Sequence, residues 1–155
     1  MKVTTFVLSL LCFCFTQVQG QENGCAIQAK KIDSLVMAND FDKALDAWKQ
    51  VTKCQNQSVY ISGEKTLTHQ LSTKLAAEDK TRYESDLLQL YTDYDRYFPG
   101  NANSNGVKKA MFLYKKDKGD PQVFDLLERA FTKDREHFND ANAMQIYFGQ
   151  FIREA

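Results

Sequence analysis

The stretch that decides the fold is Asn39 to Cys54, NDFDKALDAWKQVTKC, in which apolar residues recur three and four positions apart. That spacing predicts a helix from Phe41 to Cys54, because side chains three and four positions apart share one helix face. A second helical pattern precedes it over residues 24–38, and the pair Asn39-Asp40 separates the two. The sequence therefore predicts two antiparallel helices joined by a short turn.

Two cysteines lie at equal distances from this turn. Cys25 opens the first predicted helix and Cys54 closes the second. Residues equidistant from the turn come level in an antiparallel pair, so the positions predict a disulfide. The alternative is a pair of buried free thiols, because a bridge requires Cα atoms within about 7 Å of each other.

The N-terminal 20 residues have the pattern of a secretory signal. Lys2 supplies the positive charge, an apolar run follows from Phe6 to Phe15, and small residues precede a cleavage site before Gln21. The run is shorter than the roughly 20 residues that a membrane helix needs, which disfavours the alternative of an uncleaved anchor. We expect one mature domain over residues 21–155 without a transmembrane span. It would be periplasmic, secreted or associated with the outer membrane.

Composition narrows the class of protein further. The chain has 20 basic and 20 acidic residues, and this balance argues against binding to nucleic acid. Its only two prolines, Pro99 and Pro121, fall at predicted helix boundaries. No alternating strand pattern interrupts the helical periodicity. The sequence predicts an all-α fold.

We expect about seven helices, stacked as antiparallel hairpins in an α-solenoid. Beyond the first hairpin they run from Ser58, over residues 79–97, 105–116 and 121–137, and from Asp140, with Ser58, Asp120 and Asp140 as N-caps. The seventh has no partner helix within this chain. We expect its aromatic residues to pack on further repeats beyond Ala155, or to bind a partner; they are Tyr147, Phe148 and Phe151.

The first hairpin resembles a tetratricopeptide repeat. The residues that match the turn and second helix of such a repeat are Asn39, Asp40, Phe41, Ala44, Leu45 and Trp48. The resemblance implies that Phe41, Ala44, Leu45 and Trp48 form the core of the repeat. Gln28 and Asn56 depart from the pattern, because a large aromatic residue and a closing proline are usual at those positions.

A second resemblance covers nearly the whole mature chain. The chain is similar to exported tetratricopeptide-type proteins of Bacteroidetes bacteria through Cys25, Phe41, Ala44, Trp48, Cys54, Tyr60 and Gly63. This resemblance implies a bacterial cell-envelope protein of greater length.

No residue pattern indicates catalysis, a cofactor or a bound metal. The two histidines, His69 and His137, lie in no metal-binding or hydrolase motif, and the mature chain has no Cys-x-x-Cys pair. Asp93 and Asp95 fall within a helix and lack the spacing of a calcium loop. We therefore predict that the chain is not an enzyme.

The predicted function is a non-catalytic helical-repeat scaffold that mediates protein–protein interaction in the bacterial cell envelope, with unknown protein partners. One alternative is a protein that binds a glycan or small ligand through the tyrosine-rich helix, on which Tyr83, Tyr91, Tyr94 and Tyr97 lie. Buried tyrosine rings would count against it. A second alternative is a secreted eukaryotic ligand carrier, a class that usually contains more disulfides.

Overall fold

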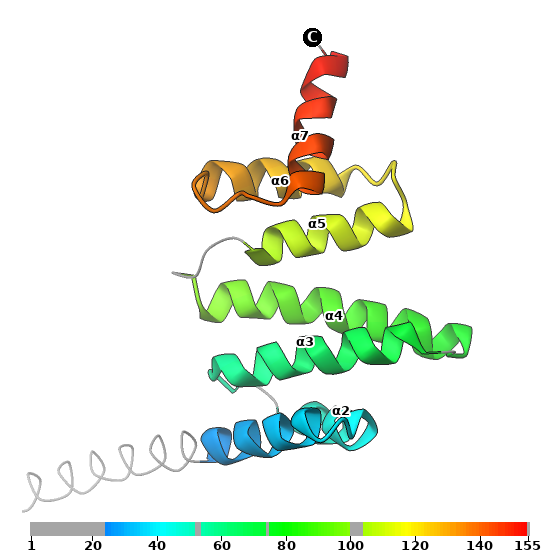
Figure 1. Cartoon of the computed structure of the whole chain (residues 1–155), viewed down its shortest axis with the longest axis vertical. Coiled ribbons are helices and arrows are strands. Elements are labelled where there is room, and N and C mark those ends of the chain that lie inside the picture. The colour runs from blue at the N-terminus through cyan, green and yellow to red at the C-terminus, as the bar shows by residue number, and fades with distance from the viewer. Residues whose placement is uncertain (1–23, 52–53, 74, 100–103, 155) are drawn as a thin grey trace, which may run out of the picture. The chain divides into compact units, whose positions relative to one another are not determined.

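The computed structural model describes residues 24–51, 54–73, 75–99 and 104–154, and all regular structure within these ranges is helical (Figure 1). The predicted all-α fold is confirmed, whereas the solenoid arrangement stays a prediction. The predicted signal segment lies outside the described residues. The chain divides into two compact units, unit 1 up to Tyr83 and unit 2 from Glu84. No helix of the described residues is long and apolar enough to cross a membrane.

Unit 1 begins with the predicted hairpin. A helix over residues 24–37 is followed by α2, Phe41–Lys49. Asn39 makes the turn with a φ of 58°, a conformation that asparagine tolerates better than most residues. Asp40 is the N-cap of α2 and accepts a hydrogen bond from the Lys43 amide. The Lys43 ammonium also donates to this carboxylate at 2.7 Å, which lowers the pKa of Asp40.

The prediction that α2 continues to Cys54 is wrong. The helix ends at Lys49, where the Gln50 amide turns back to the carbonyls of Ala47 and Trp48. The β-branched pair Val51-Thr52 follows, and such residues favour helix less than those before them. Cys54 therefore lies in the connection to the next helix.

The third helix, α3, is Gln57–Ser72. Its N-cap is Asn56 rather than the predicted Ser58, because the Asn56 side chain accepts the Ser58 amide at 3.0 Å. The Asp33 carboxylate of the first helix accepts hydrogen bonds from the hydroxyls of Ser58 and Ser62. Gln70 donates to Asp42 at 2.8 Å, so polar bonds at both ends of α3 hold it on the hairpin.

Unit 2 contains most of α4, Ala77–Tyr97, and α5, Ser104–Lys116. Side-chain hydrogen bonds join these helices, among them Asn105 to Asp95 at 3.2 Å, Lys109 to Thr92 at 3.1 Å and Lys116 to Glu84 at 2.6 Å. Each pair is centred near residue 100, which is the register of an antiparallel hairpin.

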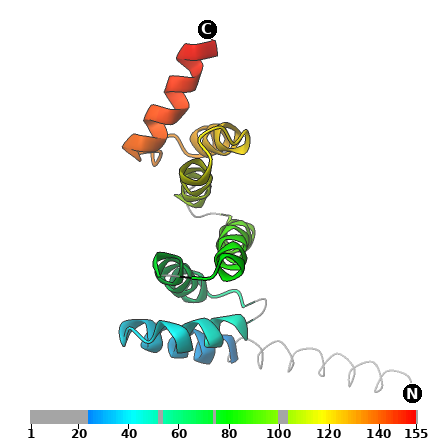
Figure 2. The same cartoon turned by 90° about the vertical axis from the view of Figure 1, so that its right-hand side faces the viewer.

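The helices α6, Gln122–Lys133, and α7, Ala141–Glu154, complete unit 2. Figure 2 views α5 and α6 nearly end-on, side by side, while α7 runs obliquely past them. A buried apolar cluster joins the three; its members are Ala110, Leu113, Val123, Leu127, Ala130, Phe138, Ala143 and Tyr147.

The boundaries of α6 differ from those predicted. It ends at Lys133 rather than His137, since Asp134 leaves the helical conformation. Its N-cap position is Pro121 rather than the predicted Asp120. The Asp120 carboxylate nevertheless accepts a hydrogen bond from the Gln122 amide at 2.8 Å. Asp140 precedes α7 as predicted and accepts the Ala143 amide at 2.8 Å.

Candidate functional site

Cys25 and Cys54 come together as predicted. The structure joins them in a disulfide with Cα atoms 5.5 Å apart. Cys54 is buried and Cys25 is partly exposed. The bond ties the start of the first helix to the connection between α2 and α3, so it acts on the architecture of unit 1.

The four residues expected in the repeat core separate into two kinds. Ala44 and Leu45 are buried, whereas Phe41 and Trp48 are only partly buried. Phe41 stacks on the His69 ring of α3, with ring centroids 3.8 Å apart. Its contact therefore extends from the hairpin to the next helix.

The tyrosines of α4 are poorly placed to stack on a sugar. Tyr83 and Tyr91 are 8% and 5% exposed, and Tyr94 and Tyr97 are partly buried. The Lys49 ammonium also lies over the Tyr83 ring, 5.1 Å from its centroid. This burial weighs against the glycan-binding alternative, because a stacking platform needs open ring faces.

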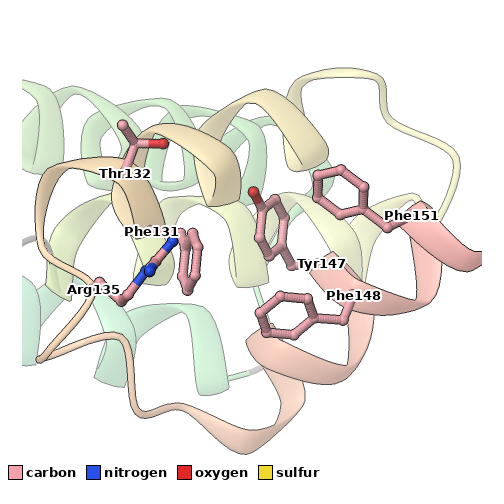
Figure 3. A pocket seen from close by; sticks show the side chains of 6 residues that line it. All are labelled: Phe131, Thr132, Arg135, Tyr147, Phe148 and Phe151. Atoms are coloured by element: carbon pink, nitrogen blue, oxygen red, sulfur yellow. The ribbon is translucent and has the colours of Figure 1, made fainter.

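An aromatic hollow lies between α6 and α7. It has a volume of about 560 Å³ and is lined by Phe131, Thr132, Arg135, Tyr147, Phe148 and Phe151. Figure 3 shows the rings of Phe131, Tyr147 and Phe148 turned toward one another, with the Arg135 guanidinium beside Phe131. We call it the α6–α7 hollow.

Ring contacts fix the shape of this hollow. The Phe131 centroid lies 5.2 Å from that of Tyr147 and 5.5 Å from that of Phe148. Tyr147 contacts Phe151 edge-on at 5.2 Å. The edge-to-face contacts, Phe131 with Phe148 and Tyr147 with Phe151, orient the rings that line the hollow.

The periodicity of the two helices explains why these rings meet. On α6, Phe124 and Phe131 are seven positions apart, which is two helical turns. On α7, Tyr147 and Phe151 are one turn apart and face α6. Tyr147 is buried, and this burial raises the pKa of its hydroxyl.

The charge in the hollow comes from Arg135. Its guanidinium carbon lies 4.7 Å from the centroid of the Phe131 ring. None of the ion pairs within the described residues involves Arg135. The hollow therefore combines apolar rings with an exposed cation.

The histidines lie in different units and have separate contacts. His69 stacks on Phe41, and the His137 ring bonds to the Asp134 carboxylate at 2.8 Å. That bond raises the pKa of His137 and lowers the pKa of Asp134. No cluster of three or more potential metal ligands occurs in the described ranges.

Sequence reasoning identified half of the hollow. Tyr147, Phe148 and Phe151 were expected to pack on further repeats or to bind a partner. Phe131 and Arg135 were not singled out, because the expected helix over residues 121–137 hid the turn that brings Arg135 beside the rings.

No family model, curated protein or solved structure matches this chain, so the tetratricopeptide resemblance stays a prediction.

Proposed function

We propose that this chain is a non-catalytic interaction module of an exported bacterial envelope protein, and that it binds a protein partner at the α6–α7 hollow. The observation that carries the proposal is the hollow itself, in which Phe148 and Phe151 remain 42% and 48% exposed beside Arg135. On the surface of a soluble protein, exposed aromatic rings rarely cluster around a cation outside binding sites.

The chemistry of the hollow favours one kind of occupant. Its walls take an aromatic or aliphatic side chain, and its rim cation attracts a carboxylate. The occupant is therefore a protein segment that carries an apolar residue and an acidic residue close together.

A further observation supports the export part of the proposal. Disulfides persist in oxidising compartments, so the Cys25–Cys54 bond agrees with export.

The test is a selection of short displayed peptides on the intact disulfide-bonded protein. We expect the selected peptides to share an apolar residue next to Asp or Glu, and to bind with an affinity measurable by fluorescence anisotropy. Arg135→Glu should weaken binding about tenfold or more, because it replaces attraction by repulsion.

A matched control separates this site from a general effect of charge. Lys118→Glu makes the same reversal in the exposed connection between α5 and α6, and should leave the affinity unchanged. Selected peptides without acidic residues, or equal losses in the two variants, would contradict the proposed site.

A further inference from the structure

The aromatic stripe of α6 that faces α7 also carries an acidic residue. Phe124, Glu128 and Phe131 follow one another at intervals of four and three residues, which puts them on one face of the helix. Phe124 and Phe131 both contact the Tyr147 ring, with centroids 5.4 and 5.2 Å from its own. Glu128 lies between these two contacts along the helix and is exposed, so it stands at the edge of the contact between α6 and α7.

The other charged residues of α6 lie on a different face. Asp125, Arg129 and Lys133 follow at intervals of four residues and form a stripe of their own. At 3.6 residues per turn, the middle of that stripe is turned roughly 150° from the face that Phe124 and Phe131 share. Within α6, the charge beside the aromatic rings is therefore that of Glu128.

Arg135 supplies the opposite charge on the other side of Phe131. It follows Phe131 by four residues, just past the end of α6 at Lys133, and its guanidinium carbon lies 4.7 Å from the centroid of the Phe131 ring. Glu128 precedes Phe131 by three residues, and both charged residues are exposed. An acidic and a basic residue thus flank one wall of the α6–α7 hollow.

Both charges act on the same hydroxyl group. Burial raises the pKa of Tyr147, the negative charge of Glu128 raises it further, and the positive charge of Arg135 lowers it. The Tyr147 side chain lines the hollow (Figure 3). Two opposite charges therefore lie within electrostatic reach of one point in the hollow, which has a negative and a positive side in addition to its apolar walls.

We propose that the protein segment that binds the hollow carries a basic residue as well as an acidic one, placed on either side of its apolar residue. The basic residue lies opposite Glu128, the acidic residue lies opposite Arg135, and the apolar side chain contacts Phe131 between them. Complementary charges fix the orientation of such a segment, because like charges meet when it is reversed. This inference rests on the proposed function and specifies its partner further.

The positions of the two charges also set their spacing in the partner. The seven positions from Glu128 to Arg135 span about 10 Å at the rise of a helix. A short segment is extended in water, because an isolated helix needs about 12–15 residues to be stable. An extended chain covers about 10 Å in three residues. We therefore expect the acidic and basic residues about three positions apart, with the apolar residue between them.

Reversal of both charges tests the inference. A labelled peptide from the displayed-peptide selection is compared with a swapped peptide, in which the acidic and basic residues exchange places. By fluorescence anisotropy, the intact protein should bind the selected peptide about tenfold or more tightly than the swapped peptide. The double variant Glu128→Lys/Arg135→Glu should prefer the swapped peptide, because each ion pair is then restored with its charges exchanged.

A single variant separates the contact of Glu128 from that of Arg135. Glu128→Lys should weaken binding of the selected peptide about threefold or more, since an exposed attraction becomes a repulsion. Asp46→Lys makes the same reversal at an exposed position of α2 in unit 1, and should leave the affinity unchanged. The melting temperature of each variant establishes that it is folded.

The outcomes distinguish this inference from the proposed function. A loss of affinity in Arg135→Glu without a loss in Glu128→Lys would overturn the inference and leave the proposed site in place. A double variant that still prefers the selected peptide would do the same. A selection that yields no binding peptide, or peptides whose affinity does not change in Arg135→Glu, would overturn the proposed site and this inference with it.

Discussion

Cys25 and Cys54 are joined across the first hairpin with their Cα atoms 5.5 Å apart, although Cys54 lies beyond the end of α2. The bond closes a loop with a sequence separation of 29 residues, and it holds the connection that leads into α3 against the start of the first helix. The disulfide therefore ties together two segments of unit 1, the start of the first helix and the connection between α2 and α3.

Removing this disulfide should destabilise unit 1. For the double variant Cys25→Ser/Cys54→Ser we expect a loss of about 3–4 kcal/mol in the free energy of unfolding, because the unfolded chain regains the entropy of an open loop. Urea denaturation measures the loss. The reduced wild type should match the double variant, and a reductant should have no effect on the variant itself. An unchanged urea midpoint would contradict the prediction.

The Asp33 carboxylate should contribute strongly to the packing of α3. Asp33→Ala removes the acceptor of two hydroxyls, one of which, on Ser62, is buried. We expect a loss of about 1–3 kcal/mol, since a buried donor is left without a partner. Asp46→Ala removes an exposed carboxylate of α2 and should change the stability by less than about 0.5 kcal/mol.

A double-mutant cycle separates the contact from other effects of the substitution. If Asp33 acts through Ser62, the double variant Asp33→Ala/Ser62→Ala should lose less stability than the sum of the single variants. Additive losses in thermal or urea denaturation would mean that the contact contributes little.

The helical periodicity predicted the fold class and much of its burial. Ala44 and Leu45, which were expected in the core of the first hairpin, are buried. Helix ends were predicted less well, because they depend on which side chain satisfies the first amides. Asn56 and Ser58 are both good caps by residue type, and only the backbone of the folded chain selects Asn56.

The candidate site was harder to predict for a related reason. The apolar pattern of α7 indicated that Tyr147 is in a contact, but it does not distinguish packing on α6 from packing on a further repeat. Likewise the sequence gives no sign of the stack between Phe41 and His69, since their contact depends on how α3 crosses the hairpin. Such contacts between distant segments arise from tertiary packing.

Leu127 should be among the most costly residues to truncate in unit 2. It lies on α6, fully buried in the apolar cluster that joins α5, α6 and α7, so Leu127→Ala leaves a cavity and should cost about 2–5 kcal/mol. Leu126 precedes it on the same helix but is only partly buried, and Leu126→Ala is the matched control with a smaller expected loss. Thermal denaturation of both variants measures the difference. An equal or larger loss for Leu126→Ala would contradict the position of Leu127 in the core.

The His137–Asp134 contact should make a small contribution to stability that depends on pH. The hydrogen bond raises the pKa of His137 above its ordinary value of 6.5, so the contribution of His137 is fully present below that value. It is lost as the pH rises through the raised pKa. The same bond lowers the pKa of Asp134 below 3.8, so the contribution of Asp134 is lost only as the pH falls through the lowered pKa. The contact is therefore strongest between about pH 4 and pH 6.

An NMR titration of the His137 imidazole tests this coupling. The Asp134 carboxylate also accepts a hydrogen bond from the His137 backbone amide at 3.3 Å. The isosteric variant Asp134→Asn removes the charge but keeps an oxygen that can accept this bond. We expect the pKa of His137 to fall toward its ordinary value in Asp134→Asn. Glu136→Gln is the matched control, because the charge of Glu136 raises the pKa of His137 less than the contact with Asp134 does, so the decrease there should be much smaller. Equal decreases in the two variants would mean that general negative charge, rather than the hydrogen bond that His137 donates to Asp134, sets the pKa of His137.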